Sequence, residues 1–280
     1  MSELSLVFFT VLAQSAVGMF IALGLVELCF KPERKAMNIA FMASLALLGL
    51  GALASVTHLG QPLRMFNVMF GLAHLSPLSM EIVALSLFGG AAFTYTAMRV
   101  LNIQPMLQKL VLPVAMVLGV VFVLAIVNVY RLPTVLSWNS HWTTFQFLMT
   151  AGVVGPVAAA LVLRVLAPQL GTTQVHADRS LALLALMTMT LSLVGFAAYA
   201  VWLGQLNAYL NPFAIAHGEL FTVARIGLMV MGVLLLAIQA LRGESLNKGS
   251  ALFAFIFVVL AELAGRAFFY DSYISASAGM

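Results

Sequence analysis

Residues 107–130 decide the fold class, because they read LQKLVLPVAMVLGVVFVLAIVNVY with a single charged residue, Lys109, near the start. At 1.5 Å of rise per residue, a helix over this stretch would be about 36 Å long. The hydrocarbon core of a bilayer is about 30 Å thick. The stretch therefore predicts a transmembrane helix.

The rest of the chain repeats this pattern. Of its 280 residues, 63% are hydrophobic and only 8% are charged, whereas soluble domains carry about 25% charged residues. Apolar runs bounded by charged residues, Pro, Asn and Gly predict eight spans, over residues 5–29, 37–57, 80–100, 107–130, 143–166, 180–205, 216–241 and 250–271. We expect an all-α, polytopic membrane protein, with a single integral-membrane domain over 1–280 and little mass outside the bilayer.

Lys and Arg are distributed unevenly between the two sides of this predicted bundle. The connections after the first, third, fifth and seventh spans hold nine of them, namely Lys31, Arg34, Lys35, Arg99, Lys109, Arg164, Arg179, Arg242 and Lys248. The other side holds only Arg64 and Arg131. Because basic residues favour the cytoplasmic side, we expect both termini on the periplasmic side of a bacterial inner membrane.

Polar side chains within the spans gather in the half of the membrane that faces the termini. Ionisable groups inside a bilayer are costly, so each invites a functional hypothesis. This half holds Gln14, His58, Arg64, Glu81, His217, Glu219, Arg225, Glu262 and Arg266. The other half holds only Glu27, which we expect to pair with Lys31.

Structural roles compete with functional ones at several of these positions. Glu262 and Arg266 are four residues apart on one helix face and can neutralise each other. Arg225 can pair with Glu219 or with Glu262. Gln14 can serve as an interhelical hydrogen-bonding group. The sequence leaves the roles of these groups open.

Several kinds of redox centre are excluded by the residues present. The single cysteine, Cys29, rules out an intramolecular disulfide or a four-thiolate cluster within the chain. None of the five histidines is predicted near the middle of the membrane, as axial haem ligands require. Zinc-ligand spacing is missing as well. We expect no haem, iron–sulfur cluster or metal site in this chain.

A lipid-soluble quinol would suit the polar half. Its oxidation needs a hydrogen-bond partner for a ring hydroxyl and a group that takes a proton near neutral pH. Histidine has an unperturbed pKa of about 6.5, and burial moves carboxyl groups towards that range. His58 and Glu81, on adjacent helices at the same predicted depth, offer both groups.

Two segments give the sequence a family resemblance. The run His58-Leu59-Gly60-Gln61-Pro62-Leu63-Arg64-Met65-Phe66-Asn67, followed by Leu78-Ser79-Met80-Glu81-Ile82, resembles the DmsC family, the membrane-anchor subunits of dimethyl sulfoxide reductase and related molybdenum enzymes. Residues 9–14, FTVLAQ, look like the first span of that family. The resemblance covers essentially the whole chain, although Ser2-Glu3-Leu4-Ser5 replaces a His-Glu-Trp-Pro-like lead.

The resemblance implies a function and a set of site residues. Members of the family bind menaquinol, hold no haem and pass electrons to an iron–sulfur subunit, and a molybdopterin-containing catalytic subunit completes a heterotrimer. His58 matches the quinol-site histidine of the family, Glu81 its acidic partner and Arg64 its motif arginine. We expect Gln14 to be a more distant contact of the quinol, and the partner subunits to lie on the periplasmic face.

Three alternatives remain. A secondary transporter would use Glu219, Arg225, Glu262 and Arg266 as a substrate and proton path, but transport needs polar groups in both halves of the membrane. An NrfD-type quinone anchor would differ mainly in its partner enzyme. A purely structural anchor would have no quinol site.

Overall fold

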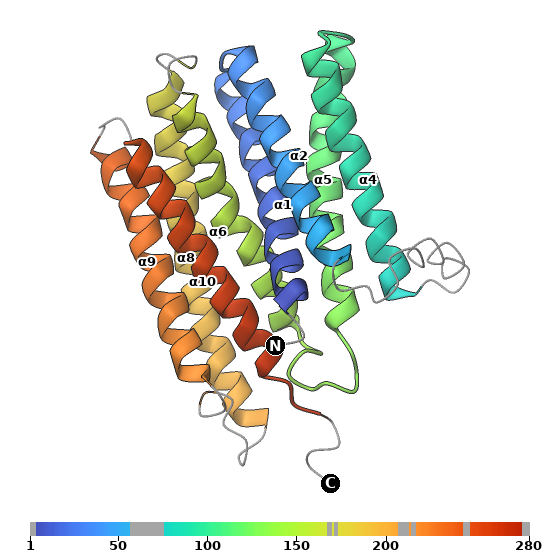
Figure 1. The fold of residues 1–280 in the computed structure, drawn as a ribbon, viewed down its shortest axis with the longest axis vertical. Helices are drawn as coiled ribbons and strands as arrows, with labels where there is room; N and C mark the ends of the chain where they lie inside the picture. Colours follow the sequence, from blue (N-terminus) through green and yellow to red (C-terminus); the bar gives the residue numbers. More distant parts are fainter. Residues whose placement is uncertain are drawn as a thin grey trace.

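The computed structural model describes residues 4–56, 76–166, 170, 173–206, 213, 217–242 and 247–275. These residues form eight long helices, each apolar enough to cross a membrane, and no β-strand beyond an isolated bridge. The helices are α1 (Leu4–Phe30), α2 (Arg34–Val56), α4 (Pro77–Val100), α5 (Pro105–Tyr130), α6 (His141–Val165), α8 (Thr173–Leu206), α9 (Gly218–Leu241) and α10 (Lys248–Asp271) (Figure 1). The prediction of an all-helical, polytopic membrane protein is confirmed.

Helix ends follow local capping chemistry rather than hydropathy. The Ser76 hydroxyl accepts a hydrogen bond from the backbone N–H of Ser79 at 3.2 Å and caps α4. The longest helix, α8, begins at Thr173, whereas the apolar run begins at residue 180. Its first turns are polar but packed, since Gln174 and Asp178 are buried and share a hydrogen bond of 2.6 Å. Hydropathy marks the apolar part of a helix, and a polar first turn extends beyond it.

Of the eight helices, α1 is the most buried and lies near the middle of the bundle (Figure 1). It packs against α2, α5, α6 and α10. The α4–α5 hairpin lies on one side of α1 and α2, while α8 and α9 lie on the far side of α6 and α10. Because the helices run up and down in turn, α1 begins and α10 ends at the same face. We call this the terminal face and the other the opposite face.

Two glycines allow α1 and α6 to cross at close range. A Cβ added to Gly18 would lie 1.9 Å from the carbonyl oxygen of Ala151, and one added to Gly155 would lie 2.2 Å from the carbonyl carbon of Gly18. Small residues let the backbones of membrane helices approach closely, which favours packing where no hydrophobic effect drives association. The crossing holds α1 in the centre of the bundle.

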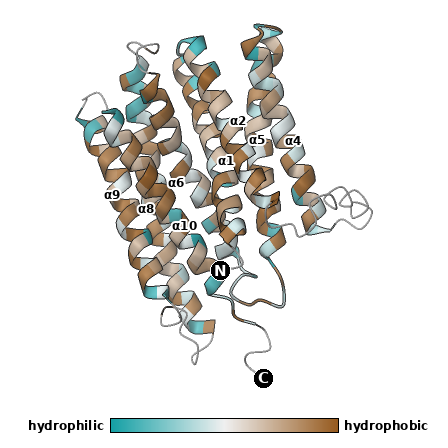
Figure 2. Ribbon diagram, in the orientation of Figure 1, coloured by the Kyte–Doolittle hydropathy of each residue, from teal (hydrophilic) through white to brown (hydrophobic). Residues whose placement is uncertain are grey.

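The helices consist mostly of apolar residues along their length (Figure 2), and many large apolar side chains are exposed on the outside of the bundle. Side chains such as Leu53, Phe93 and Val223 are 63%, 65% and 70% exposed. Such a surface would form large sticky patches in water. In a bilayer, these apolar side chains contact the lipid chains instead of water.

Candidate functional site

Two of the predicted site residues lie within the described part of the chain and two do not. His58 and Arg64 fall in 57–75, outside the described residues. Glu81 lies in the second turn of α4, at the terminal face, and its side chain is buried at 5% exposure. Among the described residues, its Oε1 atom has no hydrogen-bond partner. A buried carboxyl oxygen without a partner is costly, so this atom marks a place where a ligand hydroxyl would be stabilised.

Tyr130, the last residue of α5, connects Glu81 to an aromatic cluster. The Glu81 carboxylate is close enough to the Tyr130 phenol to interact with it electrostatically, and the Tyr130 ring packs against Tyr270 of α10. The Tyr130 ring lies 5.5 Å from that of Tyr270 and 5.6 Å from that of Phe147, between ring centroids. Glu81 therefore lies at the edge of a cluster of aromatic rings under the terminal face, formed by Tyr130, Phe147 and Tyr270. We call this cluster the aromatic platform.

The α5–α6 connection is tied to the end of α10 and closes this platform. The Trp138 indole N–H donates to the carbonyl oxygen of Phe269 at 2.8 Å, and the two rings stack at 5.3 Å. The backbone N–H of Leu136 donates to the carbonyl oxygen of Ile274 at 3.0 Å, and that of Ile274 donates to the Ser137 hydroxyl at 3.1 Å. These contacts hold the terminal ends of α5, α6 and α10 together.

A second group of polar side chains is buried deeper in the same half, and Arg266 of α10 is at its centre. The Nη2 atom of Arg266 donates to Gln14 Oε1 at 2.7 Å and to Thr150 Oγ1 at 3.1 Å. Thr150 donates to Glu262 Oε2 at 2.6 Å. The guanidinium also lies 3.5 Å from the centroid of the Phe147 ring, a cation–π contact. Gln14 thus forms the interhelical hydrogen bond that was one of its two predicted roles.

Arg225 of α9 completes this group. Its Nη2 atom lies 3.6 Å from Glu262 Oε1, and its Nη1 atom is 3.5 Å from Gln146 Oε1. Its guanidinium lies 4.7 Å from the centroid of Phe196. Gly265 makes room for the arginine, because a Cβ there would be 2.7 Å from Arg225 Cδ and Nε.

We call Gln14, Gln146, Thr150, Arg225, Glu262 and Arg266 the buried network. Every member is at most 5% exposed, and together they join α1, α6, α9 and α10. Of the two partners predicted for Arg225, the structure selects Glu262, while Glu219 is exposed. The predicted direct pairing of Glu262 with Arg266 is replaced by a link through Thr150.

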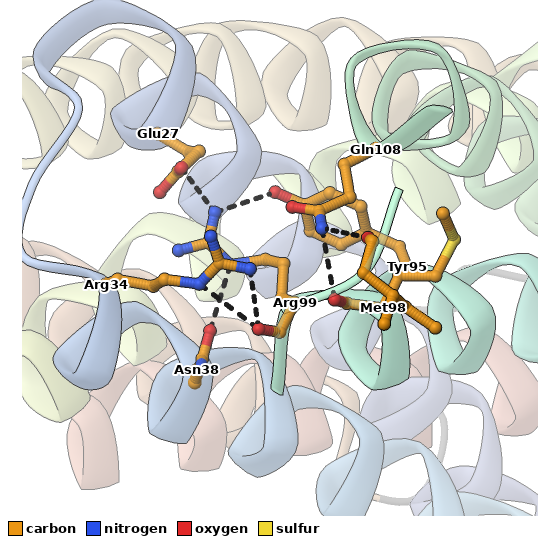
Figure 3. A network of polar contacts seen from close by, with 8 residues as sticks. Glu27, Arg34, Asn38, Tyr95, Met98, Arg99 and Gln108 are labelled. Atoms are coloured by element: carbon orange, nitrogen blue, oxygen red, sulfur yellow. Dashed lines mark hydrogen bonds and ion pairs between the residues drawn. The ribbon is translucent and has the colours of Figure 1, made fainter. Parts of the chain in front are cut away.

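The prediction for Glu27 was wrong. Glu27 pairs with Arg99 rather than Lys31, and Arg99 is buried in the last turn of α4 instead of lying in a connection (Figure 3). Arg99 also donates to Asn38 Oδ1 at 3.1 Å and to the Tyr95 hydroxyl at 3.3 Å. Hydropathy places Arg99 at the edge of an apolar run and cannot tell a buried end from an exposed one. The opposite half is therefore more polar than predicted.

Along α1, an apolar stretch separates the polar groups of the two halves. Gln14 and Glu27 are about 20 Å apart along α1 at 1.5 Å per residue. Between them the buried side chains of α1 are apolar except for Ser15, which donates to the carbonyl oxygen of Val11 within its own helix. Phe20 lies in this stretch, 5.2 Å from Phe41 and 5.7 Å from Phe88 between ring centroids. Within the described residues, α1 thus carries no polar path between the two halves, which argues against the transporter alternative.

No group of three or more His, Cys, Asp or Glu side chains that could hold a metal ion is present among the described residues. The fold and the site together define a multi-pass membrane protein with clusters of polar side chains inside its helical bundle.

The family model described as the DMSO reductase anchor subunit (DmsC) matches residues 1–271, so the chain belongs to that family. The resemblance in the sequence is thereby confirmed. As a member of this family, the chain is a membrane anchor of a DMSO reductase complex, which implies catalytic and electron-transfer partner subunits.

Three relatives are similar over nearly their whole length. The C subunit of the anaerobic dimethyl sulfoxide reductase of Escherichia coli is 32% identical over 283 residues, covering 98% of this protein and 96% of the relative. The anaerobic dimethyl sulfoxide reductase subunit YnfH from the same organism is 31% identical over 278 residues, covering 98% and 95%. The C subunit of the Haemophilus influenzae reductase is 29% identical over 278 residues, again covering 98% and 95%. No solved structure matches.

Proposed function

We propose that this chain oxidises menaquinol at the terminal face and passes the electrons to an iron–sulfur subunit, which supplies a molybdopterin-containing catalytic subunit. The observation that carries this proposal is Glu81, a carboxyl group buried at 5% exposure whose Oε1 atom has no partner among the described residues. A quinol hydroxyl is a donor of the kind that such an oxygen accepts. The apolar surface around it gives a quinol access from lipid.

In this proposal Glu81 takes one of the two protons that oxidation of the quinol releases, and His58 takes or relays the other. The Tyr130 phenol lies near the Glu81 carboxylate, at the edge of the aromatic platform. Arg64 either holds Glu81 in its charged form or binds an acidic surface of a partner subunit. Gln14 is a more distant member of the site, since its carboxamide oxygen is already bonded to Arg266.

The partner subunits are proposed to bind at the terminal face, as part of a heterotrimer. By the distribution of Lys and Arg this face is periplasmic and the membrane is the bacterial inner membrane. The apolar stretch of α1 around Phe20 supports a short route, because its buried side chains include no histidine or cysteine that could hold a redox group between the two faces. Electrons released beside Glu81 would then leave through the same face.

Replacing Glu81 by Gln, or His58 by Ala, tests the site in the assembled complex. We expect both variants to lose at least 90% of quinol-dependent turnover, because each removes a proton acceptor. Turnover with a reduced viologen, which supplies electrons directly to the partner subunits, should be unchanged.

Glu219→Gln is the matched control, since Glu219 is an exposed carboxylate near the same face. It should keep quinol-dependent activity. Full quinol oxidation by the Glu81→Gln or His58→Ala complex would overturn the site. Loss of the viologen-dependent activity from the membrane fraction as well would show a failure of assembly, and a quinol-analogue binding titration on the variant anchor would then decide the question.

A further inference from the structure

A basic cavity lies at the opposite face, far from the proposed quinol site. It has a volume of about 510 Å³ and lies among the ends of α1, α2, α4 and α5. Four cationic side chains line it, from Lys31, Arg34, Arg99 and Lys109, together with one carboxylate, that of Glu27. The count of four positive charges against one negative leaves an excess of three. We call this cavity the basic pocket.

The cations of the basic pocket fall into a fixed pair and a free pair. Arg99 is held by Glu27, Asn38 and Tyr95, and Arg34 donates from Nε and Nη2 to the carbonyl oxygen of Arg99 at 3.1 and 2.7 Å (Figure 3). Both guanidinium groups are therefore pre-organised.

The two lysines form the free pair. Lys31 and Lys109 are exposed, and neither forms a salt bridge with any described side chain. The carboxylate of Glu27 is neutralised by Arg99, so it does not cancel the charge that the lysines and Arg34 present. Such an arrangement favours an anion with several acceptor oxygens, as a phosphate group has.

A separate, apolar groove lies nearer the middle of the membrane. Its volume is about 200 Å³, and among its lining residues are Leu25 of α1 and Val120 of α5. The basic pocket is lined by Leu28 and Leu112 on the same two helices. Leu25 and Leu28 are three residues apart, and Leu112 and Val120 are each four residues from Met116, so each set follows one side of its helix. Both cavities therefore border the α1–α5 seam.

Met116 lies between the two cavities. A Cβ added to Gly24 would be 2.8 Å from Met116 Sδ, so the glycine leaves the methionine room to lie in the seam. Methionine is flexible and adapts to irregular apolar partners. The α1–α5 seam thus has the basic pocket at one end, which can bind a charged group, and the apolar groove beyond Met116, which can hold a hydrocarbon chain.

We propose that the basic pocket binds the phosphate of an anionic phospholipid, with an acyl chain in the apolar groove. A phosphate group alone would use the cations but not the groove, and a zwitterionic lipid would bring its own ammonium into a site with excess positive charge. Basic pockets between membrane helices on the side that carries the Lys and Arg excess bind anionic headgroups. The bound lipid stabilises the α1–α2–α4–α5 half of the bundle by mass action.

The test uses the full chain in a neutral detergent and measures both bound lipid, by native mass spectrometry, and thermal unfolding. The probes are dioleoyl phosphatidylglycerol, dioleoyl phosphatidylcholine and inorganic phosphate. We expect phosphatidylglycerol to bind and to raise Tm, with little effect from the other two. The double variant Lys31→Gln/Lys109→Gln should weaken phosphatidylglycerol binding at least tenfold.

The matched control is Lys35→Gln/Arg242→Gln, which removes the same charge from exposed positions at the same face that do not line the pocket. It should bind phosphatidylglycerol as the unmodified chain does. If inorganic phosphate raised Tm as much as phosphatidylglycerol does, the pocket would be a site for a free anion and the lipid proposal would be overturned. If phosphatidylcholine bound as tightly as phosphatidylglycerol, the pocket would not select anionic lipids. If the control variant lost as much binding as Lys31→Gln/Lys109→Gln, the pocket lysines would have no specific role. Either result would overturn the proposal. None of these readouts depends on quinol oxidation.

Discussion

The described part of the bundle contains two arginine–glutamate pairs, one in each half, and they differ in their access to the outside. In the buried network, the side chains of Arg225 and Glu262 are 4% and 2% exposed, and their neighbours are amide, hydroxyl and aromatic groups of other helices. In the opposite half, Glu27 is 19% exposed and borders the cavity of about 510 Å³. The same two residue types are enclosed in one place and open to a ligand in the other.

The pairs also differ in which parts of the chain they join. The buried network connects α1 and α6 with α9 and α10, whereas Glu27, Asn38 and Arg99 connect α1, α2 and α4. A buried ion pair contributes little net stability compared with apolar residues, but breaking it leaves a charge without a partner. We infer that the enclosed pair fixes the arrangement of distant helices, and that the open pair shapes a binding surface.

The largest expected effect comes from Glu262→Ala. It leaves Arg225 and Arg266 buried without their shared carboxylate, which should lower the free energy of unfolding by about 3–5 kcal/mol. Unfolding of the detergent-solubilised chain by denaturant, followed by circular dichroism, measures this change. Glu219→Ala, at an exposed position, should change it by no more than about 0.5 kcal/mol. Similar losses in the two variants would mean that the network does not hold the helices.

Gly18→Ala should have an intermediate effect, and it tests whether α1 couples the two halves. The added methyl group would lie 1.9 Å from the Ala151 carbonyl oxygen, so α1 and α6 must separate at a cost of about 1–3 kcal/mol. Gly49→Ala and Gly90→Ala are the controls, because nothing lies within 4 Å of a Cβ at either position. Since alanine favours helix, these two variants should be as stable as the unmodified chain or slightly more so, and a similar loss in them would refute the close crossing.

Glu27→Gln should have the smallest effect on stability. Arg99 keeps its hydrogen bonds to Asn38 and Tyr95, and the pocket admits water, so we expect a loss of about 1–2 kcal/mol. The same unfolding experiment gives the value. A loss as large as that of Glu262→Ala would show that the open pair is as essential to the fold as the enclosed one, and the distinction between them would fail.

The fold was predictable because a bilayer imposes a simple requirement on every span. Residues 107–130 show this most clearly, because a helix so long and so apolar is stable in a bilayer but not in water. The ends of spans were less predictable. Arg99 lies one residue before the end of α4, where hydropathy is the same whether the side chain turns into the bundle or into solvent. Its spacing of four from Tyr95 was the only local hint that it shares a helix face with buried residues.

Which polar residues lie within the spans was predictable, but which of them contact one another was not. Glu81 was identified from its place at the start of a span and from the family resemblance, and its burial is consistent with that choice. The preference of Arg225 for Glu262 over Glu219 depends on how α9 lies against α10, which no local spacing determines. The bond from Arg266 to Gln14 joins residues 252 positions apart, and a single sequence contains no signal for such a pair.

That separation of 252 positions between Gln14 and Arg266 sets the order of events during biosynthesis. Polypeptides grow at about 5–20 residues per second, so the carboxamide of the first helix waits roughly 10–50 s in the membrane before its guanidinium partner is made. Until then, the hydrogen bond between Gln14 and Arg266 cannot form. The contact that joins the first helix to the last is therefore completed only when the final helix has been made.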